Sequence, residues 1–350
     1  MTKAFTIRGK KIGEGFPVYM IAEMSANHGG DFDQAVRIIH AAKEAGADAI
    51  KLQTYTPETI TIDCQKDDFL VGRGTLWEGR SLYALYEEAF TPWEWQPELK
   101  HIAENVGLEL FSSPFDSTAV DFLEKMDVPA YKVASFELVD IPLLNKIGST
   151  GKPVIMSTGM ASLTEIEEAI MALKETGCPE IAILKCTSAY PAPPEAMNLR
   201  TIPHLSEAFG YPVGLSDHTL GLAIPIAAVS LGACIIEKHF TLSRSIPGPD
   251  SAFSLEPDEF QEMVKSIRVA EKALGTITYL PNGQEEKMRA YRRSLFVVKD
   301  MKTGEYFTQD NVRSIRPGYG LHTRHLTNVL GRKASRDIER GTPLSWELVG

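Results

Sequence analysis

The sequence predicts a (β/α)8 barrel followed by a small second domain. Two observations predict the barrel: short apolar runs recur between residues 17 and 275, and amphipathic stretches separate them. Such runs are typical of parallel strands buried on both faces, and their alternation with helices is typical of parallel α/β folds. Eight repeats in about 260 residues fit an eight-stranded barrel. A doubly wound sheet is the structural alternative, but no glycine-rich phosphate loop follows the first run.

The elements can be placed in order along the chain. Ser162 followed by Glu165 predicts a capping box at a helix start, and Asp31 opens another amphipathic stretch. The connection from Thr54 to Trp95 is long and rich in tryptophan and tyrosine, which argues against disorder. We expect it to form a rim or lid that touches substrate, or only to pack over the barrel mouth. The eight predicted strands are residues 18–22, 49–53, 108–112, 130–133, 154–157, 181–184, 213–215 and 234–237.

The pattern changes after the last barrel helix. We assign residues 1–275 to the barrel, and the polar residues 276–290, with Pro281, Asn282 and Gly283, to a linker. Residues 291–350 read as short strands and turns. About 60 residues make a marginal core alone, so we expect this domain to lean on the barrel or on a second subunit.

Composition excludes several classes of protein. A net charge of -10 argues against nucleic acid as a partner. No apolar run approaches the roughly 20 residues that a membrane span needs, and the N-terminus lacks the apolar core of a signal peptide. The four cysteines show no close pairing, which favours reduced thiols in a cytoplasm: Cys64, Cys178, Cys186 and Cys234.

Polar side chains follow every predicted strand. In such barrels the active site lies at the C-terminal ends of the strands, so these groups would meet at one mouth. Capping of the next helix is the alternative for any single strand end. His218 follows the seventh strand and His239 ends the eighth, so the two imidazoles would be neighbours. Together with the nearby carboxylates of Glu23, Asp217 and Glu237 they suit a divalent transition metal, whose other ligands would be water and substrate. Asp217 is a candidate for orienting the metal or a substrate.

Two lysines interrupt apolar strands. Lys51 and Lys132 would be buried there, which is unfavourable unless the charge is paired. One interpretation is a cradle for phosphate and carboxylate groups, completed by serine hydroxyls. The alternatives are a Schiff-base lysine, as in class I aldolases, and a structural ion pair with Glu23 or Glu137. The serines that favour the anion cradle are Ser113, Ser135, Ser157 and Ser216.

These residues lie in motifs that resemble the sialic acid synthase family, the phosphoenolpyruvate-dependent nonulosonate synthases. The resemblance covers nearly the whole chain. It rests on residues 22–23 with 27–30, 51–54, 113–115, 131–135, 157–160, 214–219, 237–241 and 248–250. Residues 291–350 resemble the antifreeze-like (SAF) domain that these synthases carry.

The resemblance implies a metal-dependent transferase. It implies Mn²⁺, with Mg²⁺ or Co²⁺ as alternatives, on His218 and His239. The expected phosphoenolpyruvate-binding residues are Lys51, Ser113, Lys132, Ser135, Ser157, Ser188 and Ser216. The expected sugar-binding residues are Gln53, Glu137, Tyr190, Asp250 and Arg316, and the expected catalytic residues are Glu23, Lys51, Lys132, Glu237 and Asp250. The family further implies a homodimer in which the SAF domain, with Arg316, reaches the partner barrel.

One departure from the family bears on the acceptor sugar. Acetylneuraminate synthases place Asn-Ile-Tyr-Pro after the sixth strand, where this chain has Ser188-Ala189-Tyr190-Pro191. Residues 135–142 and 76–79 also resemble the pseudaminic acid branch. We therefore expect a 2,4-diacetamido-2,4,6-trideoxy hexose of the altrose type. The alternative is an N-acetylmannosamine-type acceptor, as in acetylneuraminate or legionaminate synthesis.

Two other classes of function stay open. A Schiff-base aldolase would cleave the same type of product and would be trapped on a lysine by borohydride. A non-enzymatic binding protein built on the same fold would bind metal without turnover of any sugar with phosphoenolpyruvate.

Overall fold

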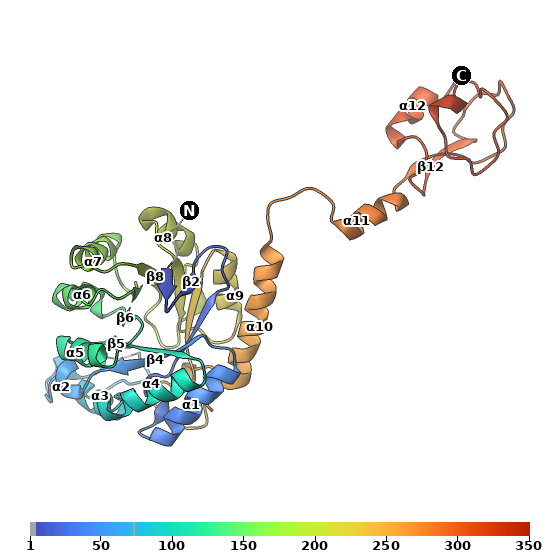
Figure 1. Cartoon of the computed structure of the whole chain (residues 1–350). Coiled ribbons are helices and arrows are strands. Elements are labelled where there is room, and N and C mark those ends of the chain that lie inside the picture. The colour runs from blue at the N-terminus through green and yellow to red at the C-terminus, as the bar shows by residue number, and fades with distance from the viewer. Residues whose placement is uncertain (1–4, 73) are drawn as a thin grey trace. The chain divides into compact units, whose positions relative to one another are not determined.

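The computed structural model describes residues 5–72 and 74–350. The chain divides into two compact units, one ending at Gly275 and one spanning Thr276–Gly350. The first unit contains a closed, parallel barrel of eight strands surrounded by helices (Figure 1). The predicted (β/α)8 barrel is therefore confirmed.

The barrel strands follow one another around the ring in chain order, and the last strand pairs with the first. In this ring β10 lies between β3 and β9, so the strand that ends in His239 has the Glu23 strand on one side and the Asp217 strand on the other. The strands are β3 (Tyr19–Glu23), β4 (Ala49–Thr54), β5 (Glu109–Pro114), β6 (Tyr131–Val133), β7 (Val154–Ser157), β8 (Ile181–Cys186), β9 (Val213–Asp217) and β10 (Ile235–His239).

Helices start where their caps predict. Asp31 accepts hydrogen bonds from the backbone of Asp33 and Gln34, and Ser162 forms the predicted capping box with Glu165. The helices of this unit are α1 (Phe32–Glu44), α2 (Pro57–Ile60), α3 (Leu82–Ala89), α4 (Gln96–Asn105), α5 (Ser117–Lys125), α6 (Ile141–Gly148), α7 (Leu163–Glu175), α8 (Thr201–Phe209), α9 (Ala223–Ser230) and α10 (Pro257–Leu274).

An antiparallel hairpin precedes the barrel. Its strands are β1 (Phe5–Ile7) and β2 (Lys10–Ile12), and Phe5, Ile7 and Ile12 are buried in the main core. The sequence did not predict this hairpin, because each strand has only three residues. No helix of the described ranges, residues 5–72 and 74–350, is both long and apolar enough to cross a bilayer.

The long connection between β4 and β5 is ordered around short helices. It carries α2, α3 and an isolated bridge between Leu70 and Ser81. The Trp77 indole nitrogen donates to the backbone oxygen of Pro249, 3.0 Å away, in the connection after β10. The segment therefore reaches the loops at the mouth, as expected of a rim.

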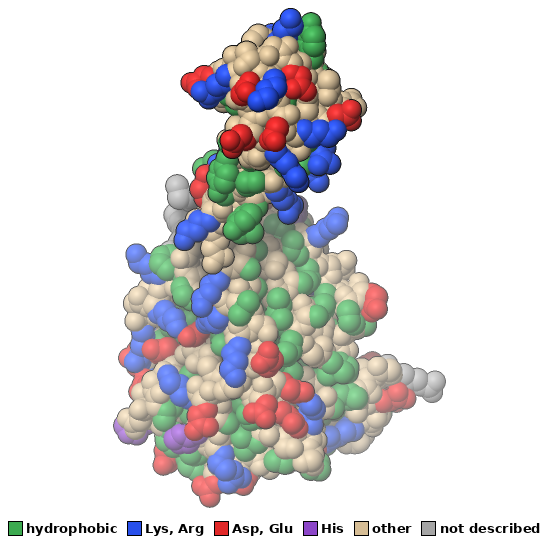
Figure 2. All heavy atoms as spheres, turned by 90° about the vertical axis from the view of Figure 1, so that its right-hand side faces the viewer, with side chains coloured by type: hydrophobic (Ala, Val, Ile, Leu, Met, Phe, Trp, Pro, Cys, Tyr) green, Lys and Arg blue, Asp and Glu red, His purple; other side chains and the backbone are tan. Residues whose placement is uncertain are grey.

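The second unit has a small core of its own. Its strands β11 (Ser294–Val297) and β12 (Val312–Ile315) pair antiparallel, and a helical turn, α12 (Leu326–Val329), adds Val329 to the core. Helix α11 (Gly283–Met288) lies in the segment that we assigned to a linker. Asn282 and Glu285 form a capping box at its start. We did not predict this helix, because the segment is polar throughout. On the face of the molecule that Figure 2 shows, Lys and Arg side chains are interspersed with Asp and Glu side chains.

Candidate active site

Glu237 lies at the centre of a buried charge cluster inside the barrel mouth. Its Oε1 is 3.4 Å from the Lys51 ammonium, 3.9 Å from the Lys132 ammonium, and accepts a hydrogen bond from Ser216 at 3.0 Å. These side chains come from β10, β4, β6 and β9. The parity of residues along each strand aims them all into the barrel.

Glu23 forms the second acidic part of the cluster. Its Oε2 lies 2.7 Å from Lys51, and its Oε1 accepts from the Gln53 amide at 3.2 Å. Lys51 also donates to the Ser113 hydroxyl at 3.4 Å. The structural ion pair between Lys51 and Glu23 that we weighed as an alternative is therefore present, although it lies inside the mouth beside the anion-binding candidates.

The two carboxylates differ in the charges that face them. Burial would raise the pKa of Glu237, but Lys132 and Lys51 together lower it below its usual value. Burial raises the pKa of Glu23 to about 7; Glu237 adds to this rise, and Lys51 and, less strongly, Lys132 oppose it. Glu237 is therefore ionised at neutral pH, whereas Glu23 can hold or release a proton there.

The serine hydroxyls gather beside Lys132. Its ammonium, almost fully buried, donates to Ser157 at 2.6 Å and to the backbone oxygen of its neighbour Val133 at 2.9 Å. Burial lowers the pKa of this lysine to about 8. Ser135 accepts from the backbone N–H of Gly159 at 3.1 Å. A Cβ at Gly159 would lie 2.2 Å from the Ser188 hydroxyl and 2.7 Å from that of Ser135, so glycine allows both serines to approach.

His218 and His239 lie side by side, with ring centroids 5.4 Å apart. The Nδ1 of His218 is 3.0 Å from the Thr187 carbonyl oxygen. Because that oxygen only accepts, Nδ1 carries a proton, and Nε2 is the nitrogen that has the lone pair in the neutral ring. Burial holds the pKa of His239 well below its usual value, and its Nδ1 has no hydrogen-bond partner among the described residues.

In their unprotonated form, the two imidazoles would each offer a nitrogen lone pair to a divalent metal. Within residues 5–72 and 74–350, no group of three or more His, Cys, Asp or Glu side chains is arranged to hold an ion. The chain would thus supply two imidazole ligands, and the remaining positions would fall to water or substrate oxygen atoms.

Aromatic rings form one wall beside the histidines. Tyr190 lies 4.3 Å from His218 between ring centroids, and Phe253 lies 4.9 Å from His239. Trp77 from the β4–β5 connection packs on Tyr190 at 5.7 Å. Rigid aromatic side chains of this kind suit the apolar faces and methyl groups of a sugar ring.

Asp250 and Ser25 complete this side of the mouth. The Ser25 hydroxyl donates to Asp250 and accepts from the Gln53 amide at 2.9 Å. Asp250 Oδ2 lies 3.8 Å from His239 Nδ1, and burial raises the pKa of its carboxyl. Ser25 therefore links Asp250 and Gln53, both predicted sugar contacts, beside the histidine pair. Ser25 itself was not among the residues predicted from the sequence.

Asp217 does not face the mouth. We had considered it for orienting sugar or metal, but its Oδ2 accepts from the Lys238 ammonium at 2.5 Å, and both side chains are fully buried. Strand alternation explains this: Ser216 and Glu237 point inward, so their neighbours Asp217 and Lys238 point toward the helices. Lys238 also donates to the Thr219 carbonyl oxygen. The pair thus joins the two strands that carry His218 and His239.

Glu137 lies just after β6, with a buried Oε2 that has no hydrogen-bond partner among the described residues. Burial raises its pKa from 4.5 to about 7. The unfolded chain would release this proton near pH 4.5 and the folded chain only near pH 7, so stability is lost as pH rises through this window. Above pH 7 the loss of folding stability caused by Glu137 reaches its full size.

Glu137→Gln is therefore expected to stabilise the protein at pH 8 but not at pH 4.5. The variant should raise Tm by a few degrees at pH 8, measured by differential scanning calorimetry in matched buffers. Glu168→Gln, at an exposed position on α7, is the control. Equal Tm values for the variant and the wild type at both pH values would contradict the assignment.

Arg316 lies in the second unit, exposed and directly after β12. Direct contacts join most of the other predicted residues inside the barrel mouth. These are Lys51, Lys132, Glu23, Glu237, Ser113, Ser157 and Ser216. Ser135 and Ser188 adjoin them across Gly159. Phe253 is a further wall residue that the sequence did not indicate, because its position depends on the loop after β10.

The sequence matches a known family over most of its length. Residues 38–279 match the NeuB family, and residues 292–349 match the SAF domain. The chain belongs to the NeuB family. The resemblance to the sialic acid synthases and the predicted C-terminal SAF domain are both confirmed.

Individual relatives of this NeuB chain are similar over nearly their whole length. A protein named pseudaminic acid synthase from Campylobacter jejuni is 48% identical over 93% of this chain and 95% of its own. One of the same name from Helicobacter pylori is 46% identical over 94% and 97%. The crystal structure of an N-acetylneuraminic acid synthetase from Leptospira borgpetersenii, in complex with citrate, superposes with a TM-score of 0.73 at 33% identity, over 82% and 95%.

Proposed function

We propose that this chain is a pseudaminic acid synthase. It condenses phosphoenolpyruvate with 2,4-diacetamido-2,4,6-trideoxy-L-altrose and releases pseudaminic acid and phosphate. The observation that carries the proposal is the buried cradle of two lysines and several serine hydroxyls beside two free imidazoles. The choice of sugar is supported by 46–48% identity to relatives named for pseudaminic acid, against 33% to the N-acetylneuraminic acid synthetase.

The lysines and serines are assigned to phosphoenolpyruvate. Its phosphate and carboxylate carry the charges that Lys51 and Lys132 would neutralise, and hydroxyls such as Ser157 would donate to their oxygen atoms. Ser113, Ser135, Ser188 and Ser216 extend the same cradle. A Schiff base is disfavoured for Lys51, because two carboxylates hold its amine in the ammonium form.

The metal is assigned to His218 and His239, and we propose Mn²⁺, with Mg²⁺ or Co²⁺ as alternatives. When bound there, it would act as a Lewis acid toward the sugar aldehyde. The imidazoles of His218 and His239 would hold it, and Tyr190, Gln53 and Asp250 would orient the sugar beside it. Alignment of two small reactants supplies much of the rate.

The reaction then balances as follows. C3 of phosphoenolpyruvate forms a bond to the aldehyde carbon, whose oxygen takes up a proton and becomes a hydroxyl. C2 becomes cationic and binds the oxygen of a water molecule, which loses a proton. Cleavage of the bond between C2 and the phosphate oxygen, with transfer of the remaining C2 hydroxyl proton to the departing phosphate, releases phosphate and leaves the ketone. Glu23 is assigned to stabilise C2 or to orient this water, since its carboxyl exchanges protons near pH 7.

A phosphate-release assay with two acceptors tests the proposal. Phosphate should be released rapidly with the 6-deoxy diacetamido altrose and slowly with N-acetylmannosamine, and EDTA should stop release. If phosphate were released faster with N-acetylmannosamine, the enzyme would be assigned as an acetylneuraminate synthase instead. Trapping of a lysine with borohydride, without phosphate release, would favour an aldolase, and metal binding without turnover would favour a binding protein.

We further propose a homodimer in which the SAF domain carries Arg316 to the partner barrel. Arg316→Ala should lower kcat/KM without changing the Tm of the barrel. Mixing this variant with Lys132→Met should restore part of the activity, because a mixed dimer keeps one intact site. Mixtures no more active than the sum of the separate variants would contradict the crossed arrangement. Each variant at the same total concentration is the control.

The reaction is assigned to the cytoplasm. The support is chemical, since the four cysteines are free thiols, as expected in a reducing compartment. No nucleic acid or membrane partner is proposed.

A further inference from the structure

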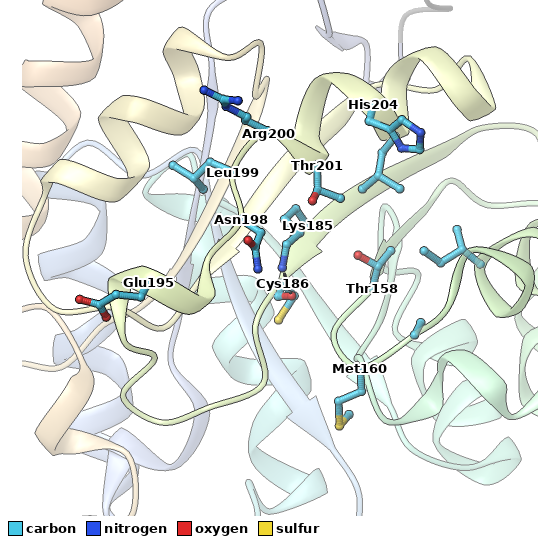
Figure 3. A pocket seen from close by; sticks show the side chains of 13 residues that line it. Thr158, Met160, Lys185, Cys186, Glu195, Asn198, Leu199, Arg200, Thr201 and His204 are labelled. Atoms are coloured by element: carbon cyan, nitrogen blue, oxygen red, sulfur yellow. Dashed lines mark hydrogen bonds between the residues drawn. The ribbon is translucent and has the colours of Figure 1, made fainter.

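A second cavity of about 970 Å³ lies beside the barrel mouth. It is lined by the connection after β7, the end of β8, and the start of α8, and it opens to solvent (Figure 3). Its size falls in the range of pockets that hold small organic ligands. None of the residues assigned to phosphoenolpyruvate, sugar or metal lines it.

Lys185 provides the charge of this cavity. Its ammonium, half-buried, donates to the Cys186 carbonyl oxygen at 2.6 Å and to the Thr187 hydroxyl at 3.1 Å. Within residues 5–72 and 74–350, no carboxylate oxygen lies within 4 Å of it. Burial lowers its pKa, as expected for a cation without a counter-charge. An anion in the cavity would supply that charge.

Further donors surround the same space. Asn198 and Thr201 point toward Lys185, and Arg200 lies at the edge of the cavity (Figure 3). In the part of the chain that the structure describes, the Arg200 guanidinium forms no ion pair. Glu195, the acidic residue of the lining, points away from the lysine in the same view. The polar side of the cavity is therefore cationic.

The lining of the cavity also includes apolar side chains. Ile166 and Leu205, both buried, line it from α7 and α8. A cavity with a cationic end and an apolar side suits a molecule that joins an oxyanion to an organic group. A bare ion would leave most of the volume unfilled.

The cavity is distinct from the phosphoenolpyruvate cradle. Lys185 and Cys186 are consecutive on β8, so their side chains leave the strand on opposite sides. The Cys186 sulfur lies 4.0 Å from His218 Nδ1, inside the mouth, whereas Lys185 faces the helices. Cys186 lines both sites, so they share this strand and this side chain, whereas Lys185 belongs to the second cavity alone.

We propose that this cavity binds the phosphate monoester of a small organic molecule. The phosphate contacts Lys185, Asn198 and Thr201 with Arg200 nearby, and the organic group packs on Ile166 and Leu205. A phosphate dianion has enough oxygen atoms to accept from Lys185, Asn198 and Thr201 together, whereas a carboxylate offers only two.

Lysine footprinting tests the site directly. The full-length protein is acetylated with N-hydroxysuccinimidyl acetate, and the labelling rate of each lysine is followed by mass spectrometry. Inorganic phosphate and adenosine 5′-monophosphate are the probes, with sodium chloride at equal ionic strength as the reference. Both probes should slow labelling of Lys185 saturably and leave Lys174, exposed on α7, unchanged. Unchanged labelling of Lys185 would overturn the proposal.

A binding measurement separates this site from the cradle. Lys185→Met should weaken binding of adenosine 5′-monophosphate at least about tenfold, because it removes a charge-assisted hydrogen bond. Lys174→Met is the matched control. Binding that depends on Lys132 instead of Lys185 would place the phosphate in the cradle and overturn the proposal. Equal affinity for inorganic phosphate and the nucleotide would overturn the apolar subsite.

Discussion

Replacing His218 or His239 with alanine is expected to reduce kcat by at least about a thousandfold, because Lewis-acid assistance is worth several kcal/mol. The same change should weaken Mn²⁺ binding, measured by calorimetry on the metal-free protein. Each imidazole is buried beside an aromatic ring at the end of its strand, and the backbone pairing of the strands does not depend on it, so the barrel should remain folded.

His40→Ala is the control for this prediction, because His40 is exposed on α1. Circular dichroism and Tm should be similar for all three variants. If His218→Ala or His239→Ala kept near-wild-type activity and unchanged metal affinity, that histidine would not be a metal ligand.

Lys132→Met is expected to raise the KM for phosphoenolpyruvate on the order of a hundredfold, because a buried ammonium that would bind the substrate is lost. Glu237 keeps Lys51 and Ser216 as partners, so the change should not leave that carboxylate unpaired. In the wild type, the pKa of about 8 predicts that KM rises as pH increases through 8, where the ammonium loses its proton. This rise should be absent in the variant.

The control for this change is Lys125→Met, at an exposed position on α5. Steady-state kinetics from pH 6.5 to 9 with saturating sugar would measure both effects. A variant with unchanged KM but reduced kcat would mean that Lys132 acts on the transition state and does not bind the ground-state substrate.

The barrel and the contents of its mouth could be predicted because both follow from local sequence. Buried parallel strands leave short apolar runs, and polar residues at their ends must converge once the barrel closes. Strand alternation also predicts the position of Asp217, although we did not apply it. Asp217 lies between Ser216 and His218, so its side chain leaves the strand on the side opposite to theirs.

Other features depended on contacts between distant segments. Ser25 joins Gln53 to Asp250 only because the loops after β3 and β10 meet. Phe253 and Trp77 reach the mouth from long connections whose path the sequence does not specify. The cavity at Lys185 has no local pattern at all, since it arises from the spacing between α7 and α8.

The mouth is built from two kinds of support. The cradle that we assign to phosphoenolpyruvate stands largely on barrel strands, whereas the aromatic wall comes from connections, with Trp77, Tyr190 and Phe253 each on a different one. Loops accept insertions and substitutions far more readily than buried strands. The acceptor range of such an enzyme can therefore diverge, in evolution or by loop exchange in the laboratory, while the donor half-reaction stays intact.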